Sequence, residues 1–490
     1  MELLLDNKWI DQVAGVRRVL GRPRKEASPV LTSDRPWETA EISGCQAVFR
    51  DDEEHKFKLW YRASVFGPSA PQSSTGGQIE TSEQVQAGRQ HFLCYAESSD
   101  GFTWHKPELG LFAFQGSTAN NILRQLGGGS NVFGNIQKDP CDPDPGKRYK
   151  ALEFDEDIGD VLPVRGVRHR GVAVAYSADG LHWPDRPKLV MSADDMTDSN
   201  MLFPGRDPHT GKWVCFMRPR CPPKRRFIGF SESDDFEHWT YPRMLLTPDK
   251  SDSEFVEFYG LTTIYRQPYY IGLVWVFHNN PYRSPMTNEL VFSRDGQNYE
   301  RVLPRMEFLP LGPVGSSDSR MIIPMGIVPH GKELFVFYSG YNSDHGSDRG
   351  QPMPPGEVAP GEPPRSEIGL ARLRDGMFSG YGADFEGMIE TKWVANYGGP
   401  GPQVLAHLEK GGWIKAEILD HYGRVLPGWE REKSRMVQCD DHLIGFTWGE
   451  KQLTGQLDDT SPEGGRIKRV IKLRFFLQQA QVFGFSVGNT

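Results

Sequence analysis

A short motif that recurs five times constrains the fold of this chain more than any other feature. Four copies are an apolar run followed by Ser and Asp, in most copies by Gly, and then by an aromatic residue a few positions later; the fifth is degraded and lacks the Ser. The aspartates of the five copies are Asp100, Asp179, Asp234, Asp295 and Asp375. Asp hydrogen-bonds to its own backbone and Gly accepts a positive φ, so each copy predicts a tight turn between antiparallel strands. We therefore expect these aspartates to be structural.

A second repeated unit, strand, polar turn and strand, lies between the motifs. Its five copies cover residues 45–63, 131–154, 200–218, 260–277 and 320–341. One such unit plus one motif gives roughly four strands per repeat, and no long amphipathic helical stretch separates the strands. Repeats of this kind are typical of propeller blades. The sequence predicts an all-β chain whose residues 1–385 form a five-bladed β-propeller.

The repeat ends near residue 385. Segments such as GWIKAEILD and IKRVIKLRFFLQQAQVFGFSV continue as strands without the aromatic motif, and the second is rich in apolar residues. Two packed sheets bury strands of this type, so residues 386–490 are predicted to form a C-terminal β-sandwich. The Pro- and Gly-rich stretch 345–366 reads as a surface insertion within the fifth blade.

The composition of the chain argues against several classes of function. The net charge of −8 and the pI of about 5.9 give no electrostatic reason to bind nucleic acid or an anionic membrane. The basic run Lys224-Arg225-Arg226 is predicted to be a solvated turn. The six cysteines contain no C-x-x-C pair, which disfavours a zinc site. No apolar run reaches the roughly 18 residues of a membrane span. The start lacks the pattern of a signal peptide, so we expect a cytoplasmic protein, or a secreted one whose leader has been removed.

The repeated Ser-x-Asp-Gly-x-x-Trp motifs on five predicted blades, followed by a predicted sandwich, resemble the five-bladed propeller glycoside hydrolases of families 32 and 43. These families include β-fructosidases and arabinanases. The segments EIGLARLRDGMFSGY and IKLRFFLQQAQVFGFSV also resemble the sequences of a bacterial group labelled family-32-like. The resemblance implies a carbohydrate substrate and cleavage of a glycosidic bond.

Two departures put fructoside specificity in doubt. The β-fructosidase signature Asn-Asp-Pro-Asn-Gly is absent from the first predicted blade. The string Arg206-Asp207-Pro208 is similar to the Arg-Asp-Pro motif of the family, but it lies in a predicted hairpin turn after an inner strand. The aspartate of the family lies before that strand, so we reject the match.

Several acidic residues lie immediately before the predicted inner strands and are candidate catalytic acids. In a propeller these strands all start at one end of the central channel, so the residues that precede them converge on one pocket. Cleavage of a glycosidic bond needs two carboxyl groups that flank it. The acids at these entrances are Glu38 and Glu41 in blade one, Asp198 in blade three, Glu254 and Glu257 in blade four and Asp318 in blade five. The related glycosidases use acids from the first, a middle and the fourth blade, which selects Glu38 or Glu41, Asp198 and Glu257.

Each acid is given a role and an alternative. Glu257 is predicted to be the general acid, with a pKa raised by burial beside two aromatic residues. Asp198 would orient the sugar or stabilise positive charge, and Glu38 or Glu41 would be the base or nucleophile. Asp318 would bind sugar hydroxyls or be one of the catalytic pair. The alternative for every one of them is a structural role in capping a turn.

Seven further residues are predicted to bind substrate: Trp37, Arg62, Asn131, Arg218, Tyr259, Arg320 and His345. The three arginines lie at or within inner and second strands, where they would pair with carboxylates or clamp an acidic sugar. The aromatic residues would stack on a sugar face or pack in the core. His345 is equally compatible with sugar contact, metal ligation and an exposed loop.

Three functions remain open from the sequence. The first is an exo-acting glycoside hydrolase. The second is a phosphorylase or transglycosidase, which clustering of Arg218, Arg320 and His345 into a phosphate cradle would indicate. The third is a non-catalytic carbohydrate-binding propeller, whose acids would be salt-bridged or more than about 10 Å apart. No cofactor is predicted. A calcium ion in the channel is possible, but no set of ligands in the sequence is specific enough to predict one. The sequence does not determine the oligomeric state.

Overall fold

The computed structural model describes residues 1–66, 89–126, 132–155, 171–184, 187–192, 202–219, 225–280, 283–345, 365–395, 401–449 and 470–487. The chain is all-β. Two single-turn 3-10 helices, η1 and η2, are its only helical elements among these residues, at Pro36–Glu38 and Pro145–Lys147. The described part contains no helix that is both long and apolar enough to cross a membrane. The strands form two compact units, residues 23–372 and residues 1–22 with 373–490.

Three four-stranded antiparallel sheets make up the first part of the 23–372 unit. The first contains β5 (Glu41–Asp51), β6 (Lys56–Phe66), β7 (Arg89–Ser98) and β8 (Ile122–Leu126). The second contains β9 (Val132–Lys138), β10 (Tyr149–Asp155), β11 (Gly171–Ser177) and β12 (Lys188–Ser192). The third contains β13 (Leu202–Arg206), β14 (Trp213–Met217), β15 (Ile228–Ser233) and β16 (Arg243–Leu246). In each sheet the strands follow chain order.

An eight-stranded sheet completes this unit, in the order β17-β18-β19-β21-β22-β23-β4 with β20 paired to β19. Its strands are β17 (Val256–Arg266), β18 (Tyr269–His278), β19 (Met286–Ser293), β20 (Glu300–Arg301), β21 (Met321–His330), β22 (Glu333–Tyr341), β23 (Ser366–Arg374) and β4 (Arg24–Lys25). A single parallel pair, Met286 with Met321, joins β19 to β21. The sheet is therefore two antiparallel groups that touch at one bridge.

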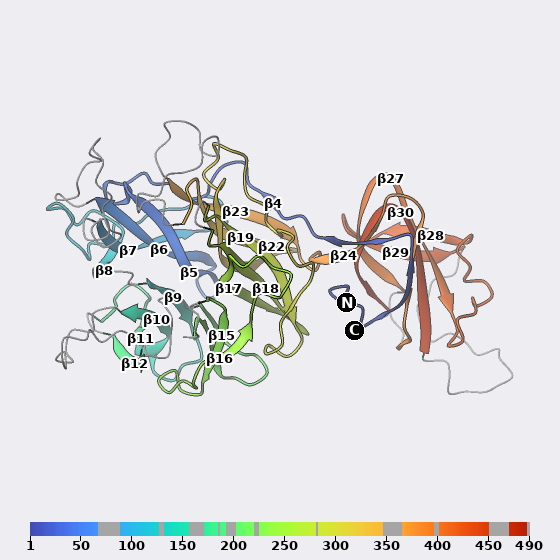
Figure 1. Cartoon of the computed structure of the whole chain (residues 1–490), viewed down its shortest axis with the longest axis horizontal. Helices are drawn as coiled ribbons and strands as arrows, with labels where there is room; N and C mark the ends of the chain where they lie inside the picture. The colour runs from blue at the N-terminus through green and yellow to red at the C-terminus, as the bar shows by residue number, and fades with distance from the viewer. Residues whose placement is uncertain are drawn as a thin grey trace. The chain divides into compact units, whose positions relative to one another are not determined.

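The first strand of each group lies against the first strand of the next. β5 neighbours β9, β9 neighbours β13, β13 neighbours β17, β17 neighbours β21, and β21 returns to β5. In Figure 1, β5, β9 and β17 lie near the middle of this unit, while β8, β12 and β16 lie toward its outside. Sheets that radiate from a closed ring of inner strands form a β-propeller. Apolar side chains fill the spaces between neighbouring sheets, as where Phe57 of β6 packs on Phe335 of β22.

The second unit is a ten-stranded sheet that follows the path β2-β25-β30-β27-β29-β28. Its strands are β1 (Glu2–Leu3), β2 (Ile10–Ala14), β3 (Arg17–Leu20), β24 (Ser379–Ala383), β25 (Gly387–Thr391), β26 (Val394–Ala395), β27 (Gln403–Leu419), β28 (Ser434–Gln438), β29 (Leu443–Trp448) and β30 (Val470–Ser486). The predicted boundary at 385/386 differs from this division. Residues 1–22 join the C-terminal unit because β2 pairs with β25 and β3 with β24.

The recurring Asp motif forms the turn that the sequence predicts. In the first copy, Ser98 Oγ donates to Asp100, and the backbone amides of Phe102 and Thr103 each donate to Asp100 Oδ1 at 2.8 Å. Trp104 Nε1 closes the turn on the Gly101 carbonyl, and Gly101 has a φ of 80°. Asp179 and Asp295 make the same contacts in their own turns.

Two of the five copies differ from the prediction. In the third copy Asp235, not Asp234, accepts from Ser233 and from the amides of Glu237 and His238. Phe236 takes the place of Gly there, with a φ of 70°. The fifth copy, at Asp375, does not lead to an outer strand of the same sheet. Its chain continues into β24 of the other unit, and β4 from the N-terminal region pairs with β23 instead.

The third motif gives a stability prediction with an internal control. Asp235→Ala removes an acceptor for two backbone amides and should lower the free energy of unfolding by about 1 kcal/mol, the usual cost of losing such a cap. Asp234→Ala, one position earlier, should change it by less than about 0.5 kcal/mol. Urea titrations of both variants followed by tryptophan fluorescence measure the difference. Equal effects would mean that the turn is not held by Asp235.

Candidate functional site

Two glutamates lie where inner strands of the propeller begin. Glu41 is the first residue of β5 and Glu257 is the second residue of β17. Both side chains are largely buried, with exposed fractions of 14% for Glu41 and 9% for Glu257. The two strands come from different sheets of the closed ring, so the start of each strand brings a carboxylate toward the same end of the unit.

Glu41 is held by side chains from two strands. Arg62 of β6 donates Nη2 to Glu41 Oε1 at 2.7 Å. The hydroxyl of Tyr341, the last residue of β22, donates to the same oxygen at 3.3 Å. A carboxylate fixed by a guanidinium and a phenol is pre-oriented, and a charge-assisted contact of this length is among the stronger hydrogen bonds of a protein.

Glu257 is held in a similar way. Arg226 Nη1 donates to Glu257 Oε2 at 2.6 Å, and Asn279 Nδ2 donates to Oε1 at 3.1 Å. The burial expected from the sequence is present, but both carboxylate oxygens have protein donors. Its predicted role as the general acid stays a prediction, because the contact with Arg226 is one that a carboxylate accepts as the anion.

Tyr259 is the centre of a cationic cluster. The guanidinium carbon of Arg218 lies 4.0 Å from the centroid of its ring, and that of Arg226 lies 5.2 Å from it. The Tyr259 hydroxyl is 3.0 Å from Nε2 of His345. Because guanidinium groups favour the face of an aromatic ring, Tyr259 of β17 gathers Arg218, which follows β14, and Arg226, which precedes β15. Arg218 and His345, which the sequence predicts to bind substrate, are thus brought together.

The segment from Tyr341 to His345 links these groups. Tyr341 contacts Glu41, and His345 contacts Tyr259. Between them, Asp344 accepts a two-pronged contact from Arg320, at 2.7 Å from Nε and 2.8 Å from Nη2. Five residues of chain therefore connect the contact with Glu41 to the contact with Tyr259, so both clusters lie at the same end of the propeller.

Glu38 and its neighbour Trp37 lie in the protein core. Glu38 is fully buried and accepts from the Tyr61 hydroxyl at 2.6 Å and from Lys106 Nζ at 2.7 Å. Its Oε2 also accepts two backbone amides of the preceding turn. Trp37 donates Nε1 to Asn121 and packs edge-on against an aromatic neighbour. These contacts are those of a structural carboxylate and a core tryptophan, so the geometry favours Glu41 over Glu38.

Asp318 has contacts that bind the blade together. It accepts from Lys25 Nζ at 2.6 Å, from Ser316 Oγ at 2.7 Å and from the Tyr338 hydroxyl at 3.2 Å. Burial alone would raise the pKa of Asp318, but the hydrogen bonds and the charge of Lys25 hold that pKa below its ordinary value. Since Lys25 belongs to the outermost strand β4, the structural alternative describes Asp318 better.

Two predicted site residues, Asn131 and Asp198, lie outside the described residues. Among the residues that the structure describes, no three His, Cys, Asp or Glu side chains gather as a metal site would require. The candidate site that remains consists of Glu41, Arg62, Arg218, Arg226, Glu257, Tyr259, Asn279, Arg320, Tyr341, Asp344 and His345.

The solved structures that resemble this chain include carbohydrate-active enzymes. A β-1,2-mannobiose phosphorylase from Listeria innocua aligns with a TM-score of 0.44 at 12% identity, over 72% of this chain and 96% of that chain. A family 32 β-fructofuranosidase of Bombyx mori aligns with a TM-score of 0.43 at 10% identity, over 95% and 94%. A fructofuranosidase from Schwanniomyces occidentalis aligns with a TM-score of 0.41 at 11% identity, over 93% and 96%.

No protein-family model and no curated protein matches the sequence. The solved structures include glycoside hydrolases, the class that the sequence motifs resemble. Their TM-scores are below 0.5, so the chemistry of this chain has to be argued from its own residues.

Four residues of the site were not found from the sequence: Arg226, Asn279, Tyr341 and Asp344. Arg226 belongs to the basic run that was predicted to be a solvated turn, yet it pairs with Glu257 and lies against Tyr259. Asn279 follows the end of β18, and Tyr341 ends β22. Second strands run back toward the end at which inner strands begin. The residues at the ends of second strands therefore lie beside the entrances of the inner strands, and this position could have identified Asn279 and Tyr341 as site residues.

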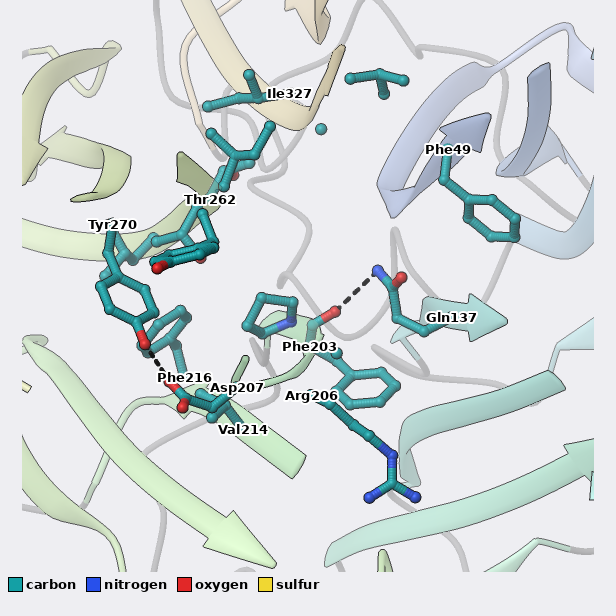
Figure 2. Close-up of a pocket in the computed structure, with 18 of the residues that line it drawn as sticks. Phe49, Gln137, Phe203, Arg206, Asp207, Val214, Phe216, Thr262, Tyr270 and Ile327 are labelled. Atoms are coloured by element: carbon teal, nitrogen blue, oxygen red, sulfur yellow. Dashed lines mark hydrogen bonds between the residues drawn. The ribbon is translucent and has the colours of Figure 1, made fainter. Parts of the chain in front are cut away.

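A cavity of about 490 Å³ lies at the other end of the inner strands. Phe49, Gln137, Arg206, Asp207 and Tyr265 line it, and Figure 2 shows several of these side chains around an open centre. The lining residues of β17 run from Leu261 to Tyr265, four to eight positions after Glu257, which corresponds to roughly 13 to 26 Å along a strand. The cavity is therefore separate from the glutamate clusters. The Arg206-Asp207-Pro208 string borders it, in a hairpin turn as predicted.

Proposed function

We propose that residues 23–372 form a five-bladed propeller and that the C-terminal unit is a β-sandwich. The closed ring β5, β9, β13, β17, β21 supports five blades, because the eight-stranded sheet divides into two groups at a single bridge. The seventeen-residue strands β27 and β30 support a sandwich. Their register shifts between Leu408 and Trp413, and such a bulge allows a long strand to bend from one layer into the next.

We infer that the chain is a carbohydrate-active enzyme that cleaves a glycosidic bond at the inner-strand entrances of the propeller. The observation that carries this proposal is the pair Glu41 and Glu257, two buried carboxylates from different sheets that are each fixed by an arginine. Glycosidic cleavage uses two carboxyl groups on opposite sides of the bond. Arg62 and Arg226 fix the rotamers, so neither carboxylate needs to be ordered when substrate binds.

The reaction proceeds in this proposal with one glutamate as proton donor to the departing oxygen and the other as base or nucleophile. Glu257 is the proposed donor. Donation requires that Glu257 first take up a proton from water and that substrate exchange the Arg226 contact for one to the glycosidic oxygen. Arg226 can move onto the face of Tyr259, near which it already lies. Glu41 remains paired with Arg62 and acts as the anion.

The test is a screen of the purified chain against aryl glycosides and plant and microbial oligosaccharides, with release of monosaccharide as the readout. Hydrolysis by the wild type, and its loss in Glu257→Gln, would support the proposal and identify the sugar. Binding of oligosaccharide without turnover across the panel would favour a non-catalytic carbohydrate-binding propeller. One observation favours that alternative: Glu38, Glu41, Glu257 and Asp318 all have cationic partners.

Phosphorolysis is the second candidate reaction, favoured by the cationic cluster at Tyr259. Arg218, Arg226 and His345 surround one ring, and Arg320 is held beside them by Asp344. Arginine clusters of this kind recognise phosphate. In phosphorolysis, a phosphate oxygen attacks the anomeric carbon while the glycosidic oxygen leaves with a proton, which yields a sugar 1-phosphate and a shortened chain.

The two reactions make opposite predictions for added phosphate. If the cluster binds phosphate as co-substrate, turnover should rise at least about tenfold with 10 mM inorganic phosphate, and a sugar 1-phosphate should accumulate. Arg218→Met, which keeps the length of the side chain and removes its charge, should abolish the phosphate effect. Turnover that is unchanged by phosphate in the wild type, with free sugar as the product, would establish hydrolysis.

A further inference from the structure

The cavity at the far end of the inner strands has the properties of a second ligand site. All five inner strands contribute to its wall through Phe49, Gln137, Pro204, Tyr265 and Ile327. Its volume of about 490 Å³ lies within the range of pockets that bind small molecules. The lining of the cavity on β17 begins at Leu261, four positions after Glu257 and roughly 13 Å along the strand, so a ligand seated among Phe49, Gln137 and Tyr265 lies beyond the reach of that carboxylate.

Aromatic side chains in the wall are held in fixed orientations. Phe49 stacks on Trp60 with ring centroids 5.4 Å apart and an angle of 29° between the planes. Tyr270 packs against Tyr265 at 4.9 Å, and its hydroxyl donates to Asp207 at 2.6 Å. Figure 2 shows Phe49 and Tyr270 on opposite sides of the cavity. Rigid aromatic faces are suited to the C–H surface of a sugar ring or another flat, partly apolar ligand.

The wall also carries neutral polar groups. Gln137 Nε2 donates to the Phe203 carbonyl at 3.1 Å, which fixes the amide, and no described residue donates to its Oε1. Thr263, half-buried on β17, adds a hydroxyl that can donate and accept. An oriented amide oxygen and a hydroxyl between aromatic faces match the alternating donors and acceptors of a polyhydroxy ligand.

The charged groups of the wall already have partners in the protein. Arg206 pairs with Asp139, donates to the Gly211 carbonyl, and stacks on Trp213 at 4.0 Å. Asp207 accepts hydrogen bonds from Tyr270 and from two backbone amides of its turn. Burial alone would raise the pKa of Asp207, but these hydrogen bonds hold that pKa below its ordinary value.

Arg50 is paired with Asp52. An anion that drew Arg206 away would deprive Asp139, whose side chain is 9% exposed, of that partner, and breaking a buried pair is costly. A neutral ligand leaves every pair intact.

We propose that this cavity binds a neutral sugar, as a free monosaccharide or as the end of a short oligosaccharide, at a site distinct from the glutamate clusters. Phe49 and the Tyr265–Tyr270 pair supply the stacking faces, and Gln137 and Thr263 bond to the hydroxyl groups. The site discriminates against sugars that carry a carboxylate, sulfate or phosphate.

Isothermal titration of the full chain with glucose, galactose, mannose, xylose, maltose and cellobiose tests the proposal, with glucuronate as the charged counterpart of glucose. At least one neutral sugar should bind, and Gln137→Leu and Thr263→Phe should each weaken that binding by about tenfold or more. The first variant removes the amide oxygen at nearly constant volume, and the second fills the cavity. Glu257→Gln should leave this binding unchanged, which separates the cavity from the proposed catalytic site.

Three results would overturn the proposal. They are the absence of binding for every neutral sugar at millimolar concentration, binding that both cavity variants retain with wild-type affinity, and binding of glucuronate as tight as that of glucose. Thermal melts of the two variants confirm that each is folded. Since Gln137→Leu adds no volume to the strand, it keeps the test valid if Thr263→Phe fails to fold.

Discussion

Glu257→Gln is expected to reduce turnover by about two to four orders of magnitude while the protein stays folded. Removal of a general acid or base costs roughly 10²–10⁴ in rate, and loss of a nucleophile costs at least as much. The substitution is nearly isosteric, and Asn279 and Arg226 lie on either side of the carboxylate that it replaces. The kcat on the substrate found in the glycan screen measures the loss, and circular dichroism measures the fold.

Glu254→Gln is the matched control for this experiment. Glu254 lies three positions before Glu257, in the turn that precedes β17; it is exposed and contributes its backbone carbonyl rather than its carboxylate to the contact with Arg225. Its substitution changes the net charge by the same amount and should leave kcat within about twofold, as expected for a surface position. Full activity in Glu257→Gln would remove this glutamate from the mechanism.

The role of Glu257 can be read from the leaving group. A proton donor matters most when the departing oxygen is a poor leaving group, so Glu257→Gln should lose far less activity on a 2,4-dinitrophenyl glycoside than on an oligosaccharide. A loss that is equally deep on both substrates would assign Glu257 to the anionic role and pass proton donation to another residue. Comparing kcat for both substrates in wild type and variant separates the two assignments.

The parts of the fold that were predictable from the sequence are those set by local chemistry. The Asp motif forms the same turn at Asp100, Asp179 and Asp295 because an Asp side chain and its own backbone amides need no distant partner. The strand hairpins follow from alternating apolar residues in the same way. The third copy was misassigned by one residue because Asp234 and Asp235 are adjacent, and only the turn geometry selects the second.

The parts that depend on distant pairing were not predictable. Nothing in the first 22 residues indicates that β2 and β3 pair with β25 and β24, more than 350 positions away. The place of Arg226 in the site was not predictable for the same reason. Its basic run was interpreted from composition, and its role follows from the tertiary contact with Glu257. Glu38 and Glu41 have equivalent positions in the sequence, and burial against Lys106 distinguishes the first as structural.

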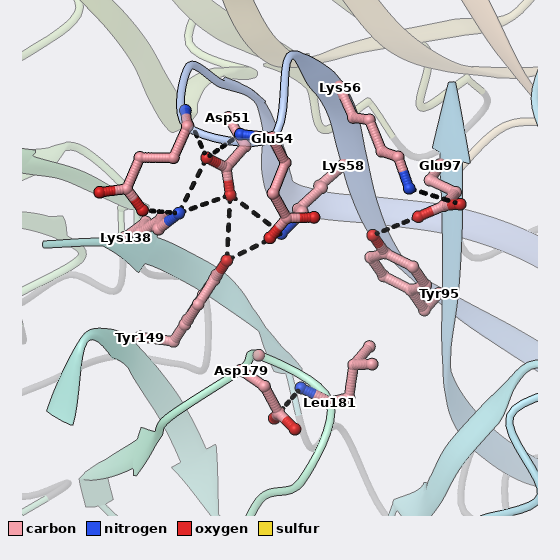
Figure 3. A network of polar contacts seen from close by, with 12 residues as sticks. Asp51, Glu54, Lys56, Lys58, Tyr95, Glu97, Lys138, Tyr149, Asp179 and Leu181 are labelled. Atoms are coloured by element: carbon pink, nitrogen blue, oxygen red, sulfur yellow. Dashed lines mark hydrogen bonds and ion pairs between the residues drawn. The ribbon is translucent and has the colours of Figure 1, made fainter. Parts of the chain in front are cut away.

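The largest effect on stability is expected from Asp51, at the end of β5. Figure 3 shows its carboxylate surrounded by Lys58, Lys138 and Tyr149, which come from β6, β9 and β10. Lys138 donates at 2.8 and 2.7 Å to its two oxygens, Lys58 lies at 2.9 Å, and Tyr149 donates at 3.1 Å. The Asp51 side chain is 1% exposed. One carboxylate therefore connects the first two sheets of the propeller.

Asp51→Asn should lower the free energy of unfolding by about 3 kcal/mol, because it removes the buried partner of Lys58 and Lys138, which then keep only the exposed carboxylates of Glu54 and Glu53. Urea titrations followed by tryptophan fluorescence measure this change. Asp52→Asn is the control, since the Asp52 side chain is 85% exposed and pairs with Arg50 alone, and surface pairs contribute about 0–1 kcal/mol. A loss below about 1 kcal/mol in Asp51→Asn would show that the network does not join the sheets.

The same network predicts how the loss depends on pH. Burial alone would raise the pKa of Asp51 from its ordinary value of 3.8, but the hydrogen bonds and charges of Lys138 and Lys58 hold the folded-state pKa well below that value. A depressed pKa stabilises the folded state above the unfolded-state pKa, and this contribution is lost as the pH falls through the folded-state pKa. The free energy of unfolding of the wild type should therefore exceed that of Asp51→Asn by a constant amount from pH 7 to about pH 5. This difference should shrink steadily below about pH 4, where the carboxyl group of the unfolded chain takes up its proton. A difference that stays constant down to pH 3 would mean that the variant is destabilised by altered packing, and that the charge of Asp51 is not what holds the two sheets together.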